Sequence, residues 1–481
     1  MATKSGDRYQ QHLFPTSIEE YVGKDDPVRA YDTIIDALPI EDLGLKERKS
    51  DVGKPNYDAK TMLKILVYAY SYGWQSSRKI ERALHHNLSF IWLAGGLKPD
   101  SRTIRRFRKD NSEALKQTLK QCARICIKLE LIEGNILFLD GSKFRGNCSI
   151  NKTYTKNGSK KLLEKLDKKI EKLLTEIDAI DEADQNVGFE KLKEELQTQE
   201  ALKNKVKSVL QEIEKKNVDK INHTDKDAIN FKGRQGSHAG YNPQVVTDEK
   251  HGLIVNVDVV AESNDKNQFA SQIRQANEIL EKQCKVACSD SGYHNVNNLS
   301  EFEDKGITVI VPSQKQASSK KKTEDLFSKE HFTYDDEKDE YICPEGQNLK
   351  YSHYSKTKEH YVYRMKESKA CSKCIHWGIC TKGKRGRTIN RLKNEEYQDK
   401  LAELYESDYG QEIYKKRKSK VELQFGHIKR NLKASSFLVR GLKSVQGEMA
   451  IYASCFNIAR MITLLGGPEK MAERLAGSVA L

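Results

Sequence analysis

Three acidic residues occupy positions from which they could hold divalent metal ions. Asp140 follows four apolar residues and precedes a glycine, and Asp290 repeats this arrangement of apolar run, acid and glycine turn. Glu422 is the one acid among eight Lys and Arg residues in the basic stretch 414–433. Carboxylate oxygens are preferred ligands of Mg²⁺, and two such ions about 3.5 to 4 Å apart can activate a water and stabilise a leaving 3′-oxygen. The three acids therefore predict phosphodiester chemistry with two Mg²⁺ or Mn²⁺ ions.

Each acid also has an ordinary structural interpretation. Glu422 could merely reduce repulsion among neighbouring lysines, since an i,i+4 pair on a helix contributes about 0.2 to 0.5 kcal/mol. Three other carboxylates compete for the role of metal ligand: Asp248, Asp258 and Asp265. The placement of Asp140 and Asp290 at strand ends favours the metal site.

The strands expected to carry the two aspartates follow a recognisable order. Strand 136–139 is followed by a hairpin, 245–260, a helix, 266–281, and two further strands, 285–289 and 307–312, with a helix between them. Strand, hairpin, helix, strand, helix, strand is the order of a ribonuclease-H-like mixed sheet. We predict an α/β fold with this core in two parts, 131–158 and 218–315, and a C-terminal helical part of the core, 391–470, that carries Glu422.

The first strand and the hairpin are separated by a segment of different composition. Residues 159–217 are rich in Lys, Glu and Leu, and their apolar residues alternate at spacings of three and four. This spacing is typical of a coiled-coil seam, so we predict an inserted helical hairpin whose helices pair with each other. Dimerisation or support of DNA are the alternatives.

A basic helix near the N-terminus predicts contact with nucleic acid. Residues 1–130 are expected to form a helical domain, in which Ser101 caps an arginine-dense helix with Ile104 and Phe107 facing inward. The net charge of +14 favours a polyanionic partner. An ordinary solvated helix is the alternative. Five basic residues are the candidate contacts with double-stranded DNA, as in a helix-turn-helix domain: Arg102, Arg105, Arg106, Arg108 and Lys109.

Four of the ten cysteines fall in one lysine-rich insertion, residues 316–390. Four thiolates are a common ligand set for a structural Zn²⁺, and His376 could replace one of them. The alternative is four reduced structural cysteines. The candidate zinc ligands are Cys343, Cys371, Cys374 and Cys380.

Several sequence blocks together resemble bacterial insertion-sequence DDE transposases. The run 139–149, Leu-Asp-Gly-Ser-Lys-Phe-Arg-Gly-Asn-Cys-Ser, resembles their first-aspartate block, and 289–293, Ser-Asp-Ser-Gly-Tyr, resembles their second. The Arg-to-Glu gap holds four residues where the usual pattern has three, so Lys418 is expected to share the role of the arginine. The residues that resemble the family's Tyr-Arg-Glu-Lys signature are Tyr414, Arg417, Glu422 and Lys429.

The resemblance implies an endonuclease that binds the inverted-repeat ends of an insertion sequence, cleaves DNA and transfers the freed 3′ end to target DNA. It implies that Asp140, Asp290 and Glu422 hold the metal ions, and that Tyr414, Arg417 and Lys429 position phosphates. It also implies double-stranded DNA as partner and a homodimer or larger synaptic complex.

Two other functions remain open at this point. A domesticated transposase would bind DNA without cutting it, and a stand-alone nuclease would cut without joining. The first predicts that at least one acid of the triad is missing or cannot ligate metal, and all three are present. No apolar run approaches the roughly 20 residues needed to span a bilayer, so we expect a cytoplasmic, nucleoid-associated bacterial protein without membrane contact.

Overall fold

A computed structural model gives the fold of most of the chain. It describes residues 17–46, 56–182, 189–233, 236–318, 327–356, 360–365 and 368–479. Contacts divide the chain into two compact units. Unit 1 comprises residues 1–265, 272–283 and 418–481, and unit 2 comprises residues 266–271 and 284–417.

Unit 1 begins with the predicted helices. The structure shows η1 (Ile18–Tyr21), α1 (Pro27–Asp36), α2 (Ile40–Leu43), α3 (Ala59–Ser71), α4 (Ser77–His86), α5 (Leu88–Leu93), α6 (Ser101–Asp110) and α7 (Ser112–Lys128). The expected cap of α6 is displaced by one residue, because the Asp100 carboxylate accepts the Thr103 N–H at 2.6 Å. Ser101 is therefore the first residue of the helix rather than its cap.

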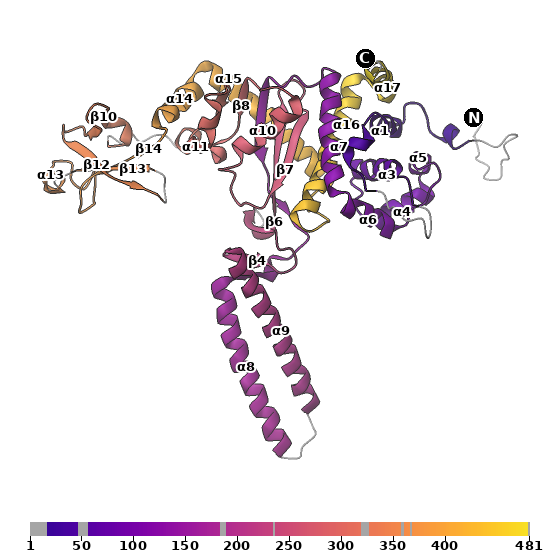
Figure 1. Ribbon diagram of the computed structural model, residues 1–481, viewed down its shortest axis with the longest axis horizontal. Helices are drawn as coiled ribbons and strands as arrows, with labels where there is room; N and C mark the ends of the chain where they lie inside the picture. Colours follow the sequence, from indigo (N-terminus) through magenta and orange to yellow (C-terminus); the bar gives the residue numbers. More distant parts are fainter. Residues whose placement is uncertain are drawn as a thin grey trace, which may run out of the picture. The chain divides into compact units, whose positions relative to one another are not determined.

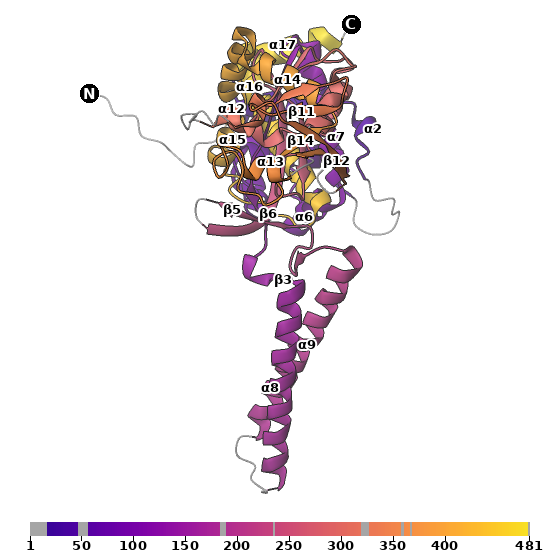
Figure 2. The ribbon, with the colours of Figure 1, turned by 90° about the vertical axis from the view of Figure 1, so that its left-hand side faces the viewer.

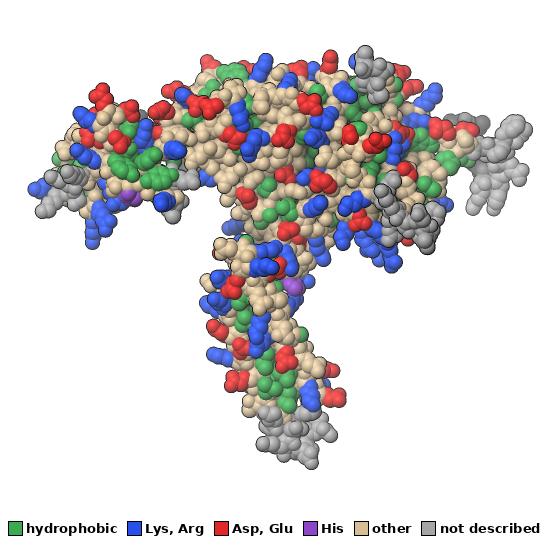
Figure 3. All heavy atoms as spheres, viewed as in Figure 1, with side chains coloured by type: hydrophobic (Ala, Val, Ile, Leu, Met, Phe, Trp, Pro, Cys, Tyr) green, Lys and Arg blue, Asp and Glu red, His purple; other side chains and the backbone are tan. Residues whose placement is uncertain are grey.

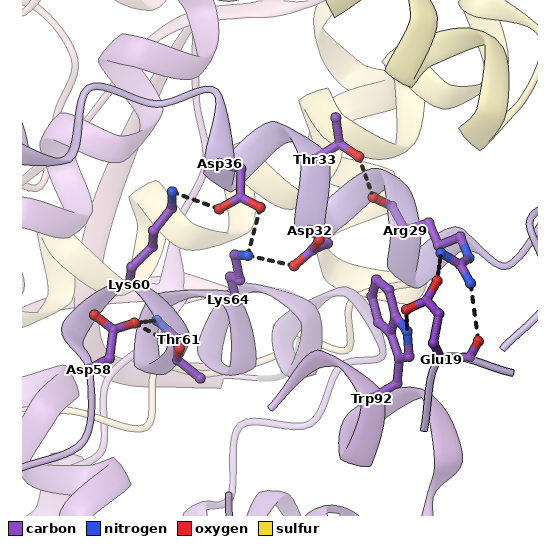
Figure 4. Close-up of polar contacts among 10 residues, drawn as sticks. All are labelled: Glu19, Arg29, Asp32, Thr33, Asp36, Asp58, Lys60, Thr61, Lys64 and Trp92. Atoms are coloured by element: carbon purple, nitrogen blue, oxygen red, sulfur yellow. Dashed lines mark hydrogen bonds and ion pairs between the residues drawn. The ribbon is translucent and has the colours of Figure 1, made fainter. Parts of the chain in front are cut away.

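Ion pairs join the first helices to one another (Figure 4). Lys64 Nζ on α3 lies 2.5 Å from Asp32 and 2.8 Å from Asp36 on α1. Glu19 pairs with Arg29 at 2.6 Å and also accepts the indole N–H of Trp92 at 2.6 Å. These contacts fix α1 against α3 and α5.

The sheet of unit 1 is built around one long strand, β6 (Gly236–Asp248). It pairs antiparallel with β1 (Ile136–Gly141), β2 (Phe144–Arg145), β5 (Ile229–Gly233) and β7 (Ile254–Val260). The register places Asp140 opposite Val245. The almost fully buried helix α16 (Leu442–Leu465) packs on α7, β7 and α3, so one core joins the N-terminal helices to this sheet.

The predicted insertion is a helical hairpin, α8 (Lys156–Glu182) and α9 (Phe189–Lys216). Figures 1 and 2 show the two helices running side by side away from a small ribbon formed by β3 (Thr153–Thr155) and β4 (Lys220–Asn222). The apolar residues face the partner helix as the spacing predicted, for example Leu166, Leu173 and Val206, which are buried.

Unit 2 combines a short parallel pair with an antiparallel sheet that we did not predict. β8 (Val286–Cys288) pairs in parallel with β9 (Thr308–Ile310). The antiparallel sheet has the order β10 (Thr333–Asp335), β11 (Glu340–Ile342), β12 (Asn348–Ser355), β13 (His360–Met365) and β14 (Thr388–Leu392). The predicted insertion 316–390 is thus largely a small sheet, with a core of Phe332, Tyr341, Leu349, Tyr363 and Ile389.

Helices complete the chain. The remaining ones are α10 (Phe269–Leu280), α11 (Val296–Leu299), α12 (Gln314–Ala317), α13 (Ser368–Ser372), α14 (Glu395–Glu406), α15 (Asp408–Arg430) and α17 (Pro468–Val479), with short 3-10 turns η2 to η5 between elements. None of the described helices is by itself both long and apolar enough to cross a membrane; α16 and residues 468–477 pass that test only together, as a pair bent by 94°.

Candidate active site

Asp140 and Lys429 approach each other in unit 1. Asp140 is half-buried at the end of β1, and its Oδ1 accepts the Gly141 N–H at 2.9 Å. Lys429 Nζ, from α15, donates to Ser142 Oγ at 2.6 Å and lies 4.5 Å from the centre of the Phe144 ring. Burial lowers the pKa of Lys429, and the negative charge of Asp140 opposes this effect. The ammonium group is therefore partly stripped of water beside the first aspartate.

Asp290, Tyr414 and Arg417 gather in unit 2. Asp290 follows β8 and caps the turn η3 (Ser291–Tyr293), with its Oδ1 accepting the Gly292 N–H at 2.8 Å. Burial raises the pKa of the Tyr414 phenol; the Arg417 charge opposes this, and the charge of Asp290 adds to it. The Arg417 guanidinium lies 5.4 Å from the Tyr414 ring centre. Two residues of the signature thus surround the second aspartate.

Glu422 is exposed on α15. A stripe of apolar residues at helical spacing lies beside it, and all four of its members are buried: Val421, Phe425, Ile428 and Leu432. Gln424 fixes the rotation of the helix, because its Nε2 donates to Gly252 O at 2.6 Å while its side chain is 1% exposed. The Glu422 carboxylate is accordingly directed to solvent.

The rival carboxylates are engaged in holding the backbone and buried amides. Asp248 is 1% exposed and accepts the Gly134 N–H at 2.7 Å, and burial raises its pKa. Asp258 Oδ1 accepts Gln446 Nε2 at 2.8 Å. Asp265 Oδ1 accepts two side-chain amides, from Asn242 at 2.6 Å and from Gln244 at 2.7 Å, and lies 3.5 Å from Lys143 Nζ. These three acids are explained without a metal ion.

Four of the five predicted DNA contacts on α6 are exposed, and one is buried. Arg102, Arg105, Arg106 and Lys109 are exposed on α6, whereas Arg108 is only 5% exposed. Arg108 Nη1 donates to Tyr70 Oη at 3.0 Å and to Gln75 O at 2.7 Å. The expectation that Arg108 contacts DNA is therefore wrong, because its guanidinium is used inside the protein.

A second basic face lies on the neighbouring helix α4. It borders a hollow of about 620 Å³ that Trp74 also lines. Lys79 Nζ lies 4.5 Å above the Trp74 ring. Figure 3 shows Lys and Arg side chains gathered where α4 and α6 reach the surface. The exposed residues of this face are Arg78, Lys79, Arg82, His85 and His86. The signal in the sequence is the share of Arg, Lys and His residues in α4.

The four predicted zinc ligands and His376 line one small pocket in unit 2. The Gln347 N–H points to Cys343 Sγ at 3.4 Å, and the Arg387 N–H points to Cys371 Sγ at 3.5 Å. Burial raises the pKa of Cys380, and its three companions add to this effect while Arg387 opposes it. The thiols are thus neighbours, but the part of the chain that the structure describes holds no group of three or more His, Cys, Asp or Glu placed to hold one metal ion.

Comparison with known proteins agrees with the sequence blocks. Residues 342–462 match the model of the family "Transposase DDE domain", and residues 16–110 match "Transposase domain (DUF772)". No curated relative matches the chain. A cryo-EM structure of a piggyBac transposase synaptic complex with hairpin DNA aligns over 94% of this chain and 79% of its own, with 11% identity and a TM-score of 0.34, too low to establish a shared fold. The two family matches confirm the predicted resemblance to insertion-sequence DDE transposases.

Proposed function

We propose that this protein cleaves the inverted-repeat ends of an insertion sequence and joins them to target DNA, with Asp140, Asp290 and Glu422 as metal ligands. The observation that carries the proposal is which residues lie near each of the two aspartates. Lys429 lies beside Asp140, and Tyr414 and Arg417 lie beside Asp290. These partners are the residues of the Tyr-Arg-Glu-Lys signature, and they share α15 with Glu422.

The strand order supports a ribonuclease-H-like core for this chemistry. β1 ends at the first aspartate, β6 and β7 follow as an antiparallel hairpin, and β8 leads to the second aspartate and pairs in parallel with β9. Helix α10 stands between β7 and β8. This is the order expected from the sequence. We propose that the fold is of that type and that the hairpin of α8 and α9 is a coiled coil.

The acids suit Mg²⁺ or Mn²⁺, since the donor set consists only of carboxylate oxygens. Two bound ions would supply an activated water and stabilise the leaving 3′-oxygen. The protein's own contribution is to hold phosphates near the acids. Folding has already removed part of the water around Lys429, so binding a phosphate there costs less desolvation of the ammonium group. Arg417 offers the planar donor pattern that fits phosphate oxygens, and Lys418 is exposed one residue further along.

DNA is proposed to lie against the exposed basic residues of α6. Arg102, Arg105, Arg106 and Lys109 all point to solvent there. Because two element ends must be cut together, we propose a homodimer or larger synaptic complex as the active form, working in the bacterial cytoplasm on the nucleoid.

We also propose that a structural Zn²⁺ is bound by four thiolates: Cys343, Cys371, Cys374 and Cys380. The N–H groups directed at two of the sulfur atoms would stabilise thiolates. Purified protein should then contain about one zinc per chain, and a chelator should lower its thermal midpoint. Protein free of zinc with an unchanged midpoint would leave four reduced structural cysteines as the correct interpretation.

The experiment is cleavage and strand transfer of labelled duplexes that carry the element's ends, with Mg²⁺ or Mn²⁺. Asp140→Asn, Asp290→Asn and Glu422→Gln should abolish cutting while leaving DNA binding intact. Glu412→Gln is the matched control, because Glu412 is an exposed acid on the same helix that pairs only with Lys416 in the described contacts. Wild type that binds ends without cutting would make the protein a domesticated DNA-binding transposase. Cutting of single ends without joining would make it a nuclease.

A further inference from the structure

A polar pocket of about 480 Å³ opens in unit 1 a few residues beyond Asp140. Lys152, which directly precedes β3, and Thr224, which follows β4, line it, so it lies at the base of the helical hairpin; Figure 1 shows this hairpin. Its volume falls in the range of about 300 to 1,000 Å³ that is typical of ligand pockets. The lining side chains that argue for a ligand are Gln75, Asn147, Ser149, Lys152, Ser436 and Arg440.

The walls of this pocket are fixed before any ligand arrives. The Phe437 N–H donates to Arg145 O at 2.9 Å, which joins the C-terminal wall to β2. Asn147 Nδ2 donates to Leu438 O at 2.5 Å, and Arg440 Nε donates to Asn147 O at 2.8 Å. A site held in this way pays little ordering entropy when it binds a ligand.

The charge of the pocket favours an anion. Lys152 and Arg440 are exposed at its rim, and no Asp or Glu of the described residues lines it. The nearest carboxylates, Asp225 and Asp227, accept the N–H groups of Gly441 and Leu442 and so hold the loop that carries Arg440. The opening is thus lined by two cations and by no acid of the described residues. Burial raises the pKa of the lining thiol Cys148, the charge of Asp225 behind the wall adds to this effect, and the charge of Arg440 opposes it.

We propose that this pocket binds a phosphodiester group of the DNA strand on its way to Asp140. The proposal rests on the proposed function and deepens it by assigning a strand contact outside α6 and α15. The Ser149 and Ser436 hydroxyls can donate to phosphate oxygens, whereas the Asn147 and Gln75 amides already donate to Leu438 O and Lys433 O. Arg440 uses Nε to hold the wall, and among the described residues no hydrogen bond of its terminal nitrogens is seen, so they can bind the ligand. Such contacts position DNA without reading its sequence.

Equilibrium binding of an element-end duplex without added Mg²⁺ or Mn²⁺ tests this, since no cutting is expected there and a structural Zn²⁺ stays in place. Lys152→Met and Arg440→Met should each weaken binding about tenfold and reduce the slope of log Kd against log salt by about one. Lys156→Met is the matched control: Lys156 is exposed four residues further along and does not line the pocket. Unchanged circular dichroism and thermal midpoints must accompany these values.

Neutral methylphosphonate links, placed one at a time along the duplex, locate the phosphate. We expect one or two adjacent positions where the neutral link weakens binding of wild type about tenfold but no longer weakens binding of Arg440→Met. The same positional loss in both proteins would overturn the proposal, as would a pocket variant that behaves like Lys156→Met. Displacement of the duplex by a free mononucleotide at constant ionic strength would overturn it in favour of a nucleotide site. Wild type that neither binds nor cuts DNA would instead refute the proposed function.

Discussion

Replacing Arg108 by alanine should destabilise the N-terminal helices rather than act mainly on DNA binding. Arg108 lies in a buried chain of polar groups: its Nη1 donates to Tyr70 Oη, and Tyr70 donates to Glu448 Oε1 at 2.8 Å. Glu448 is 1% exposed, and its other oxygen accepts the Leu438 N–H at 2.9 Å. The substitution leaves the carboxylate of Glu448 buried without its cation.

The size of the effect follows from burial. Arg108 reaches Glu448 only through the Tyr70 hydroxyl, so its loss leaves buried polar groups without a partner, which costs about 1 to 3 kcal/mol. With an m value of about 2 kcal/mol/M, the urea midpoint of this part should fall by about 1 M. Arg105→Ala is the control, since an exposed substitution shifts stability by only about 0.5 kcal/mol or less.

Tryptophan fluorescence is the assay, because the chain has three tryptophans and two, Trp74 and Trp92, lie in or beside the N-terminal helices. A Trp377→Phe background removes the third. We expect Arg105→Ala to keep the midpoint and weaken DNA binding, and Arg108→Ala to do the reverse when binding is measured on folded protein. Arg108→Ala with the wild-type midpoint and DNA binding as weak as that of Arg105→Ala would refute the assignment of Arg108 to the core.

Three further perturbations test other parts of unit 1. Gly240→Ala should lower stability by about 3 kcal/mol or more and disrupt the pairing of β2, because the added Cβ would lie 2.0 Å from Phe144 O. Gly426→Ala is the control: nothing lies within 4 Å of its added Cβ, so it should preserve or raise the thermal midpoint. Burial raises the pKa of Asp248 in the folded protein. Its contribution to stability is therefore present below the unfolded pKa of about 3.9 and is lost as the pH rises through the folded pKa. The free energy of unfolding, measured from pH 4 to 7, should fall for wild type relative to Asp248→Asn. Lys429→Met should reduce single-turnover cleavage at least about 100-fold with a small change in duplex affinity; equal losses in both would assign Lys429 to binding alone.

The helices and the strand ends were predictable because their signals are local. The apolar residues of α15 recur at helical spacing, so the buried stripe of Val421, Phe425 and Ile428 follows from the sequence. Asp140 and Asp290 each end a short apolar run, which places them at strand ends in the structure as well. The helical spacing and the strand ends can both be read from residues that are close together in the sequence.

The antiparallel sheet of unit 2 was not predictable in the same way. Its strands are short and carry many polar residues; β12, for example, is mostly exposed. Their pairing depends on contacts between tyrosines that lie on different strands, such as Tyr341 and Tyr363, whose ring centres are 5.1 Å apart. A pattern of alternating apolar residues does not reveal such a core.

Arg108 illustrates how residue type can mislead. Ile104 and Arg108 are four residues apart, so they share one face of α6, and both are buried. Assigning the inward face by apolarity alone chose Phe107 instead, which is only half-buried. The useful signal lies in α16, where Glu448 is the one acid within an apolar helix. Because a buried acid requires a polar partner, Glu448 indicates that a cation such as Arg108 lies inside the protein.

The buried contacts of Arg108, Tyr70 and Glu448 also bear on how the proposed DNA binding and cutting would be connected. Helix α16 carries Glu448, which reaches Arg108 on α6 through Tyr70, and its Asn457 accepts the Ile254 N–H of β7 at 2.8 Å. Strand β7 pairs with β6, and β6 pairs with β1, which carries Asp140. The helix that presents the exposed arginines and the strand with the first aspartate are therefore joined through one core. A domain that only tethered the enzyme to DNA would not need such a connection. We infer that DNA held on α6 is held at a set orientation to the first aspartate, so loosening this core should impair the position of the cut before it impairs affinity.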